Sequence, residues 1–140
     1  DPDSYREGWR NGDLGGVIQI TSSPVHDGVK AAKLKSDGSR IGYQLIAVEA
    51  GKEYTVSFYY TMKTSPVGSM TVSILDGAVT DPTLIAGKTI QSVTLNDQSS
   101  ASTYVAGSVT FNSGTSTSVA IYFSNVDVES RIDTFTIVEN

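Results

Sequence analysis

The feature that most constrains the fold of this chain is a series of short segments in which apolar and polar residues alternate. Alternation with a period of two is typical of β-strands, and turn-forming Gly, Pro, Asp and Asn residues separate the segments. No window keeps a helical spacing long enough to predict a helix. The nine segments are residues 15–23, 30–36, 41–48, 53–63, 69–77, 89–97, 104–113, 116–125 and 131–139. Nine short strands at this spacing predict an all-β fold, a two-sheet antiparallel β-sandwich.

Alternation also predicts which side chains face the core, because successive residues of a strand point to opposite faces. In residues 53–63 the outward set then contains Tyr59, Thr61 and Lys63, and in residues 116–125 it contains Tyr122. The predicted core residues are Val56, Phe58, Ile121, Phe123 and Phe135, together with Tyr54, Tyr60 and Phe111.

Length and composition exclude several classes of protein. The chain has 140 residues, which suits a single domain, and it has no Cys, so disulfides, thiolate metal sites and a Cys nucleophile are excluded. The only histidine, His26, rules out a zinc site built on several histidines. A net charge of −5 argues against nucleic acid as a partner.

No apolar run is long enough for a membrane span, and the start does not resemble a signal peptide. The chain opens on "DPDSYREGW", as a piece of a longer chain would. We therefore expect residues 1–140 to be one monomeric module from a larger multidomain protein that is secreted or held at the cell surface.

Outward-facing aromatic residues are the first candidates for a binding surface. Tyr59 and Tyr122 are predicted on polar strand faces, and Trp9 and Tyr43 near the edges. The apolar face of a sugar ring packs on such side chains, while polar neighbours bind its hydroxyls. Gln44 is a polar candidate, but it alternates with Tyr43, so at most one of the two reaches a ligand on a sheet surface. The alternatives are that Trp9 fills the core and that the tyrosines are ordinary strand residues.

The order of several motifs resembles the jelly-roll carbohydrate-binding modules of families 4, 9, 16 and 22. The resemblance covers nearly the whole chain and rests most on residues 44–58 ("QLIAVEAGKEYTVSF") and on "IDTFTI" near the end. The other parts are "GW" at residues 8–9, "HDGVKAAKL" at 26–34 and "YVAGSVTFNSG" at 104–114. The resemblance implies a jelly roll and a non-catalytic module that directs an attached catalytic domain to a polysaccharide.

The resemblance also implies a structural calcium ion that ties the N-terminal part of the chain to the last strand. The matching positions are the Asp27 carboxylate, the Lys30 carbonyl and Asp133. Calcium takes about six to eight oxygen ligands. The Asn-Gly-x-Phe-Glu stretch with which such modules open is not seen here, and Asp1 or Asp3 could supply the ligands that it would carry. The alternative is a purely structural Asp133, bonded to backbone N–H groups or to Arg131.

Basic residues bear on the nature of the sugar. Arg10, Arg40 and Lys63, with Arg131, lie next to the proposed surface residues in sequence or in facing. A guanidinium group can bind a carboxylate through two hydrogen bonds, so an acidic polysaccharide such as alginate is one candidate ligand. Neutral β-glucans and mannans are the other candidates, with the basic residues then serving only solubility.

Two further classes of function compete with sugar binding. A small polysaccharide-degrading enzyme would need a pair of carboxylates, but nearly all Asp and Glu residues lie in turns, and no nucleophile, zinc or phosphate-loop motif is present. We therefore predict that the module is not an enzyme. A structural or adhesive sandwich fits the fold equally well and would leave the outward aromatic residues without a role.

Overall fold

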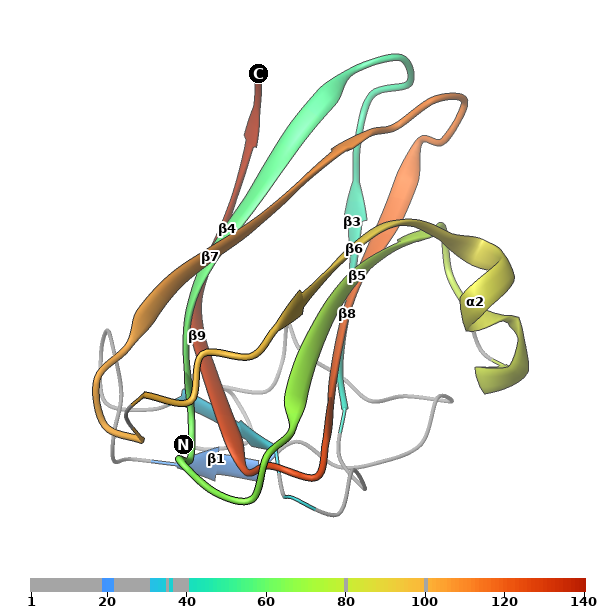
Figure 1. Ribbon diagram of the computed structural model, residues 1–140. Coiled ribbons are helices and arrows are strands. Elements are labelled where there is room, and N and C mark those ends of the chain that lie inside the picture. Colours follow the sequence, from blue (N-terminus) through green and yellow to red (C-terminus); the bar gives the residue numbers. More distant parts are fainter. Residues whose placement is uncertain (1–18, 22–30, 35, 37–40, 80, 100) are drawn as a thin grey trace.

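The computed structural model describes residues 19–21, 31–34, 36, 41–79, 81–99 and 101–140. Within them the chain forms nine strands and one short helical turn between the fifth and the sixth strand (Figure 1). The strands are β1 (Gln19–Thr21), β2 (Ala31–Leu34), β3 (Gly42–Ala47), β4 (Glu53–Met62), β5 (Ser69–Asp76), β6 (Thr89–Leu95), β7 (Val105–Asn112), β8 (Ser118–Val126) and β9 (Ser130–Glu139). The helical turn consists of η2 (Pro82–Leu84) and α2 (Ile85–Lys88), which the alternation pattern did not predict.

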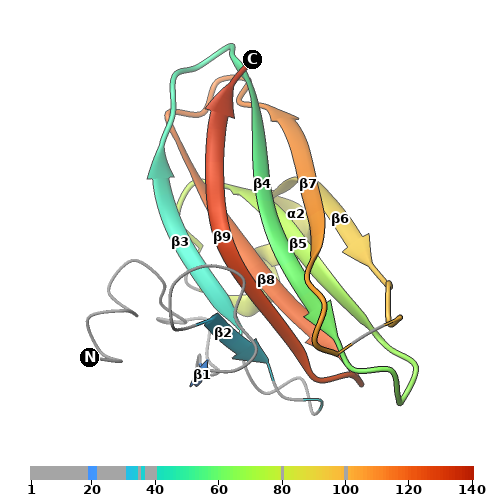
Figure 2. The same ribbon diagram turned by 90° about the vertical axis from the view of Figure 1, so that its left-hand side faces the viewer.

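The strands form two antiparallel sheets that pack face to face. A five-stranded sheet has the order β1-β2-β9-β4-β7, and a four-stranded sheet has the order β3-β8-β5-β6. Figure 2 shows the five-stranded sheet in front of the four-stranded one. Every strand pair is antiparallel, which confirms the predicted β-sandwich.

The core lies between the two sheets and contains the residues that alternation predicted. Val56 and Phe58 of β4 and Ile121 and Phe123 of β8 are all at most 1% exposed. Phe135 of β9 packs on this core, with its ring centroid 5.5 Å from that of Phe58 and 5.6 Å from that of Phe123. Tyr54, Tyr60 and Phe111 are buried too, so the predicted core is confirmed.

A β-bulge interrupts the alternation of β9. Ser57 of β4 pairs with Thr136 and Tyr59 pairs with Asp133, so β9 has one residue more than β4 between the two pairs. Thr134 has a φ of 57°, the left-handed conformation that such an extra residue can adopt. As a result Ile132 and Phe135 both face the core, while Asp133 lies opposite Tyr59 on the outer face.

Outward positions are not all accessible. Thr61 of β4 alternates with the core residue Met62, as predicted, yet it is only 1% exposed and its hydroxyl has no hydrogen-bond partner. On β8, Ala120 also faces outward and is 0% exposed. The outer faces of both sheets are therefore partly covered. None of the helices in the described ranges has the length and apolar content needed to cross a bilayer.

Candidate functional site

Five of the predicted site residues lie outside the residues that the structure describes. These are Trp9, Arg10, Asp27, Lys30 and Arg40. Their roles in sugar or calcium binding stay predictions. The other six, which the structure places, are Tyr43, Gln44, Tyr59, Lys63, Tyr122 and Asp133.

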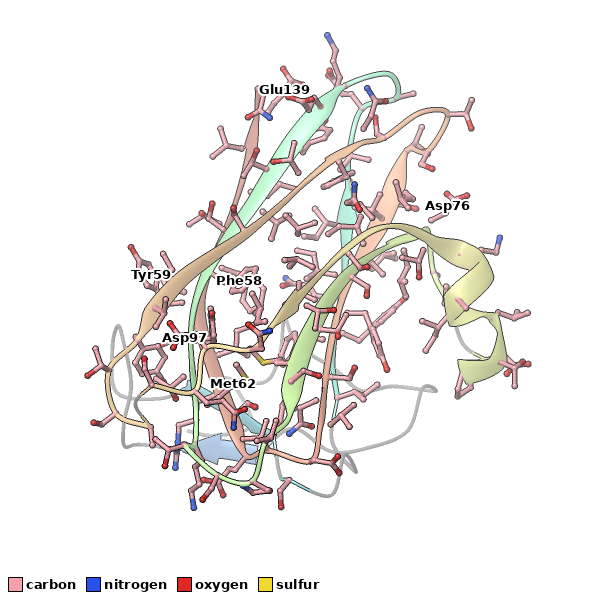
Figure 3. The ribbon with its side chains drawn as sticks, viewed as in Figure 1. Phe58, Tyr59, Met62, Asp76, Asp97 and Glu139 are labelled. Carbon is pink, nitrogen blue, oxygen red and sulfur yellow. The ribbon has the colours of Figure 1, made fainter. Side chains whose placement is uncertain are left out.

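The two outward tyrosines of the sequence prediction lie on opposite sides of the molecule. Tyr59 belongs to β4 in the five-stranded sheet, and Tyr122 belongs to β8 in the four-stranded sheet. Both alternate with core residues, so each points away from the core on the outer face of its own sheet. Figure 3 shows Tyr59 on the outer side of the five-stranded sheet. The expectation that both rings contribute to one stacking surface is therefore wrong.

Tyr122 instead has Tyr43 as its neighbour. The two residues are direct partners in the pairing of β3 with β8, and both are half-buried on the outer face of the four-stranded sheet. Tyr43 Oη accepts a hydrogen bond from the backbone N–H of Val79 at 3.3 Å. Among the described residues, no such bond reaches the Tyr122 hydroxyl. The structure thus brings together two aromatic rings that are far apart in the sequence, one of them with an uncommitted hydroxyl.

Hydroxyl side chains continue this surface across the sheet. Tyr122 pairs with Ser73 of β5, which is only 6% exposed, and Ser73 in turn pairs with the exposed Ser92 of β6. The next outward row is Ser124, Thr71 and Thr94, with the two threonine hydroxyls 3.5 Å apart. We call these residues the tyrosine face: Tyr43, Thr71, Ser73, Ser92, Thr94, Tyr122 and Ser124.

Sequence reasoning missed the serines and threonines of the tyrosine face. The signal was present, since Ser and Thr alternate with core residues in "SMTVSIL" and "SVTL". It did not show that β5 and β6 lie beside β8. The described outward positions of β3, β5, β6 and β8 carry no charged side chain, so the face offers aromatic carbon and neutral hydroxyls.

Gln44 and Lys63 do not lie on the tyrosine face. Gln44 pairs with the core residue Ile121, so it points to the opposite side of the sheet from Tyr43. Lys63 follows β4 in the other sheet, and its Nζ lies 3.3 Å from Glu129 Oε2. The same oxygen lies 3.6 Å from Arg131 Nη2. Gln44 and Lys63 are the predicted polar and basic contacts that the structure describes. Neither of them therefore lies beside Tyr43 and Tyr122.

Asp133 is the candidate metal ligand that the structure describes. It is 7% exposed and accepts a hydrogen bond from the N–H of Thr134 at 2.7 Å. A carboxylate so far removed from water needs strong compensation, and a divalent cation would supply it. The residues that the structure describes contain no cluster of three or more His, Cys, Asp or Glu that could hold a metal. Further ligands would have to come from backbone carbonyls or from the part of the chain outside the described ranges.

Comparison with solved structures places this architecture among carbohydrate-binding modules. A CBM61 domain in complex with β-1,4-galactotriose superposes with a TM-score of 0.65 at 18% identity, over 96% of this chain and 90% of that one. A family 16 module superposes with a TM-score of 0.62 at 17% identity, over 96% and 92% of the two chains. The CBM22-1 and GH10 modules of endo-1,4-β-D-xylanase 10B from Clostridium thermocellum, complexed with xylohexaose, give 0.65 at 15% identity, over 95% of this chain and 26% of that one.

The chain has the jelly-roll fold of these carbohydrate-binding modules. The resemblance predicted from the sequence is confirmed at the level of the fold, since families 16 and 22 are among the matches and a family 4 structure matches as well. The sequence itself matches no protein-family model and no curated protein.

Proposed function

We propose that this protein is a non-catalytic carbohydrate-binding module that binds a polysaccharide on its tyrosine face. The observation that carries the proposal is the pairing of Tyr43 with Tyr122 next to an uncharged strip of Ser and Thr hydroxyls. Flat aromatic rings pack on the C–H faces of sugars, and neutral hydroxyls exchange hydrogen bonds with those of the ligand. The fold shared with a CBM61 domain solved in complex with β-1,4-galactotriose supports this assignment.

The proposal includes the setting in which the module works. In the clostridial xylanase the matching module is joined to a GH10 module, and we propose that this chain likewise directs an attached catalytic domain to its polysaccharide. Polysaccharides of this kind lie outside cells, so the protein would be secreted or displayed at the surface. The module would bind as a monomer, since the tyrosine face lies within one chain.

Replacing Tyr122 with alanine is expected to weaken polysaccharide binding about tenfold, or by about 1–2 kcal/mol, without unfolding the protein. The ring is half-buried on the outer face and not part of the main core, so its loss removes a contact surface. Affinity electrophoresis against xylan, β-1,4-galactan, galactomannan, β-glucan and alginate measures this effect, with a melting curve to check folding.

Tyr59→Ala is the matched control for this experiment, because it removes an outward tyrosine from the opposite sheet. If Tyr59→Ala weakens binding and Tyr122→Ala does not, the tyrosine face is not the binding surface. If wild-type protein binds no polymer, the carbohydrate-binding proposal is wrong and the structural or adhesive class takes its place. Release of reducing ends or unsaturated sugars would show an enzyme instead.

We further propose that the ligand is neutral. The tyrosine face carries no charge, and Lys63, one of the basic residues expected to favour an acidic polymer, is paired with Glu129. Binding is then expected to change little between about 0.1 M and 1 M salt, where the screening length falls from about 10 Å to about 3 Å. A steep loss of affinity in salt, made shallower by Arg40→Ala or Lys63→Ala, would instead favour an acidic ligand such as alginate.

A calcium ion that stabilises the fold is the last part of the proposal. Asp133 would bind it through its carboxylate, with the Asp27 carboxylate and the Lys30 carbonyl as the other ligands that the family resemblance implies. The burial of Asp133 on the outer face supports this role. Since that face belongs to the five-stranded sheet and the tyrosine face to the other one, the ion would not contact the sugar.

A further inference from the structure

The connection between β5 and β6 is much longer than neighbouring antiparallel strands require. Two residues are enough to join such strands in a hairpin, yet here β5 ends at Asp76 and β6 begins at Thr89. The connection carries η2 and α2 and projects on the outer side of the four-stranded sheet, as Figure 1 shows. We call its described residues, 77–79 and 81–88, the wall.

The wall is attached to the same surface as the two tyrosines. Val79 is 4% exposed and forms a small apolar cluster with Ile41, Leu75 and Ala120, against which Tyr43, Ile85 and Tyr122 pack. The hydrogen bond from the Val79 N–H to Tyr43 Oη adds a polar attachment. The wall therefore contacts Tyr43 directly and shares an apolar cluster with Tyr122.

The wall also has its own internal bonds. Asp81 accepts hydrogen bonds from the backbone N–H and the hydroxyl of Thr83, at 3.0 and 2.8 Å, and these bonds lower the pKa of the Asp81 carboxyl. At the other end Thr89 Oγ1 donates to the Ile85 carbonyl at 2.7 Å. Hydrogen bonds within the wall and to the first residue of β6, together with the packing of Val79 and Ile85, hold this segment in place as an obstacle for a ligand.

This obstacle covers part of the outer face of the four-stranded sheet. Leu75 and Ala120 point outward and are nonetheless 0% exposed. Ser92 and Thr94 point outward on the same sheet and are exposed. The row of Tyr43, Tyr122, Ser73 and Ser92 runs across the strands. On β8 and β5 the covered Ala120 and Leu75 lie on one side of this row and the half-buried Ser124 and Thr71 lie on the other, whereas on β3 Leu45 is 49% exposed. A sugar chain that stacks on Tyr122 therefore has the wall along one edge where it crosses β8 and β5.

We propose that the wall makes this module selective for polysaccharides with few side branches, an inference that rests on the proposed function. In a β-1,4-linked mannan or xylan that lies flat on a surface with two residues per turn, successive residues are turned over, so branches on neighbouring residues point to opposite edges. A heavily branched chain cannot avoid directing some branches at the wall. A sparsely branched chain can shift along the face until its branches point to the open side. The wall thus rejects one class of ligand by steric conflict.

The test compares polymers that share a backbone and differ in branching. The matched pairs are galactomannans of low and high galactose content and arabinoxylans of low and high arabinose content. Wild-type protein is expected to bind the sparsely branched member of a pair about tenfold more tightly. A shortened variant, with residues 77–88 replaced by Asn-Gly and with Leu75→Thr to make the uncovered position polar, is expected to bind both members within about twofold.

Two single substitutions test the wall if the shortened variant does not fold. Tyr43→Phe keeps the ring but removes the acceptor of the Val79 bond, so it is expected to reduce the discrimination between branched and unbranched polymers. Tyr59→Phe is its matched control, because Tyr59 lies on the opposite sheet, away from the wall, and it should keep the discrimination.

Equal binding of both members of a pair by wild-type protein overturns the inference and leaves the proposed function standing. The same holds if the shortened variant, or Tyr43→Phe in its place, discriminates as well as wild type. Failure to bind any of these backbones overturns the inference, and failure with every polymer, alginate and β-glucan included, overturns the proposed function too.

Discussion

Replacing Phe123 with alanine is expected to lower the free energy of unfolding by about 3–5 kcal/mol. The ring is 0% exposed in the centre of the sandwich, where it stacks on Phe135 at 5.6 Å and 22°. Truncation leaves a cavity between the two sheets that surrounding strands can fill only in part. Urea denaturation measures the change, with a fluorescence or circular dichroism signal for unfolding. A loss that large is a sizeable part of the stability of an ordinary domain.

Tyr122→Ala serves as the control for this substitution, since it removes a neighbouring aromatic ring from the outer face of the same strand. Its effect on unfolding should be clearly smaller than that of Phe123→Ala. Gly42 offers a second check, because a Cβ at that position would collide with the Phe123 ring. Gly42→Ala should destabilise the wild type strongly and the Phe123→Ala variant much less. Equal effects of Gly42→Ala in the two backgrounds would contradict the described packing.

Removal of the proposed calcium ion is expected to have the second largest effect. A ligand that binds only the folded state stabilises it by about 2.7 kcal/mol when its free concentration is a hundred times the dissociation constant. For a domain of this size that corresponds to a fall in melting temperature of about 10 °C when EDTA removes the ion. Differential scanning calorimetry with EDTA and then with excess calcium measures the shift and its reversal.

Asp133→Asn is the variant that assigns the effect to the proposed site. An asparagine keeps an oxygen for the Thr134 N–H but lacks the negative charge, and the loss of that charge weakens the binding of a calcium ion. The variant should melt at a lower temperature than wild type and should not respond to EDTA. Glu139→Gln, an exposed carboxylate at the end of the same strand, should keep the full response. A wild-type melting curve that neither EDTA nor calcium moves would show that the site is not there.

Most of the fold followed from the sequence because alternation is a local property. It placed all nine strands and identified Phe58, Phe123 and Phe135 as core residues, since each alternates with polar neighbours. It did not show which strands are adjacent, because strand pairing depends on contacts between residues far apart in the chain. Alternation identified Tyr59 and Tyr122 correctly as outward residues. It could not show that they lie on opposite sheets, so the two were assigned to one surface.

The candidate site was harder to predict than the core. Tyr43 was recognised from its position near an edge, but its partnership with Tyr122 arises only when β3 pairs with β8. The wall was missed altogether, since its helical turn is too short to produce a periodic pattern and its attachment depends on two apolar residues, Val79 and Ile85. Thr61 illustrates the same limit of prediction from the sequence. Alternation predicts which face of the sheet its side chain lies on, but the burial of that side chain depends on what covers the face.

The extra residue in β9 has a consequence for how this strand can change in evolution. Thr134 separates two parts of the strand. Before it, Asp133 faces outward, where we propose that it binds calcium. After it, Phe135 faces the core. Deleting Thr134 would make Asp133 and Phe135 direct neighbours, which plain alternation already places on opposite faces, so both parts of the strand would keep their present facing. An insertion or deletion elsewhere in β9 has no such compensation, because it turns every residue on one side of the change to the opposite face. Related chains should therefore gain or lose a residue at this bulge more readily than at any other point of β9.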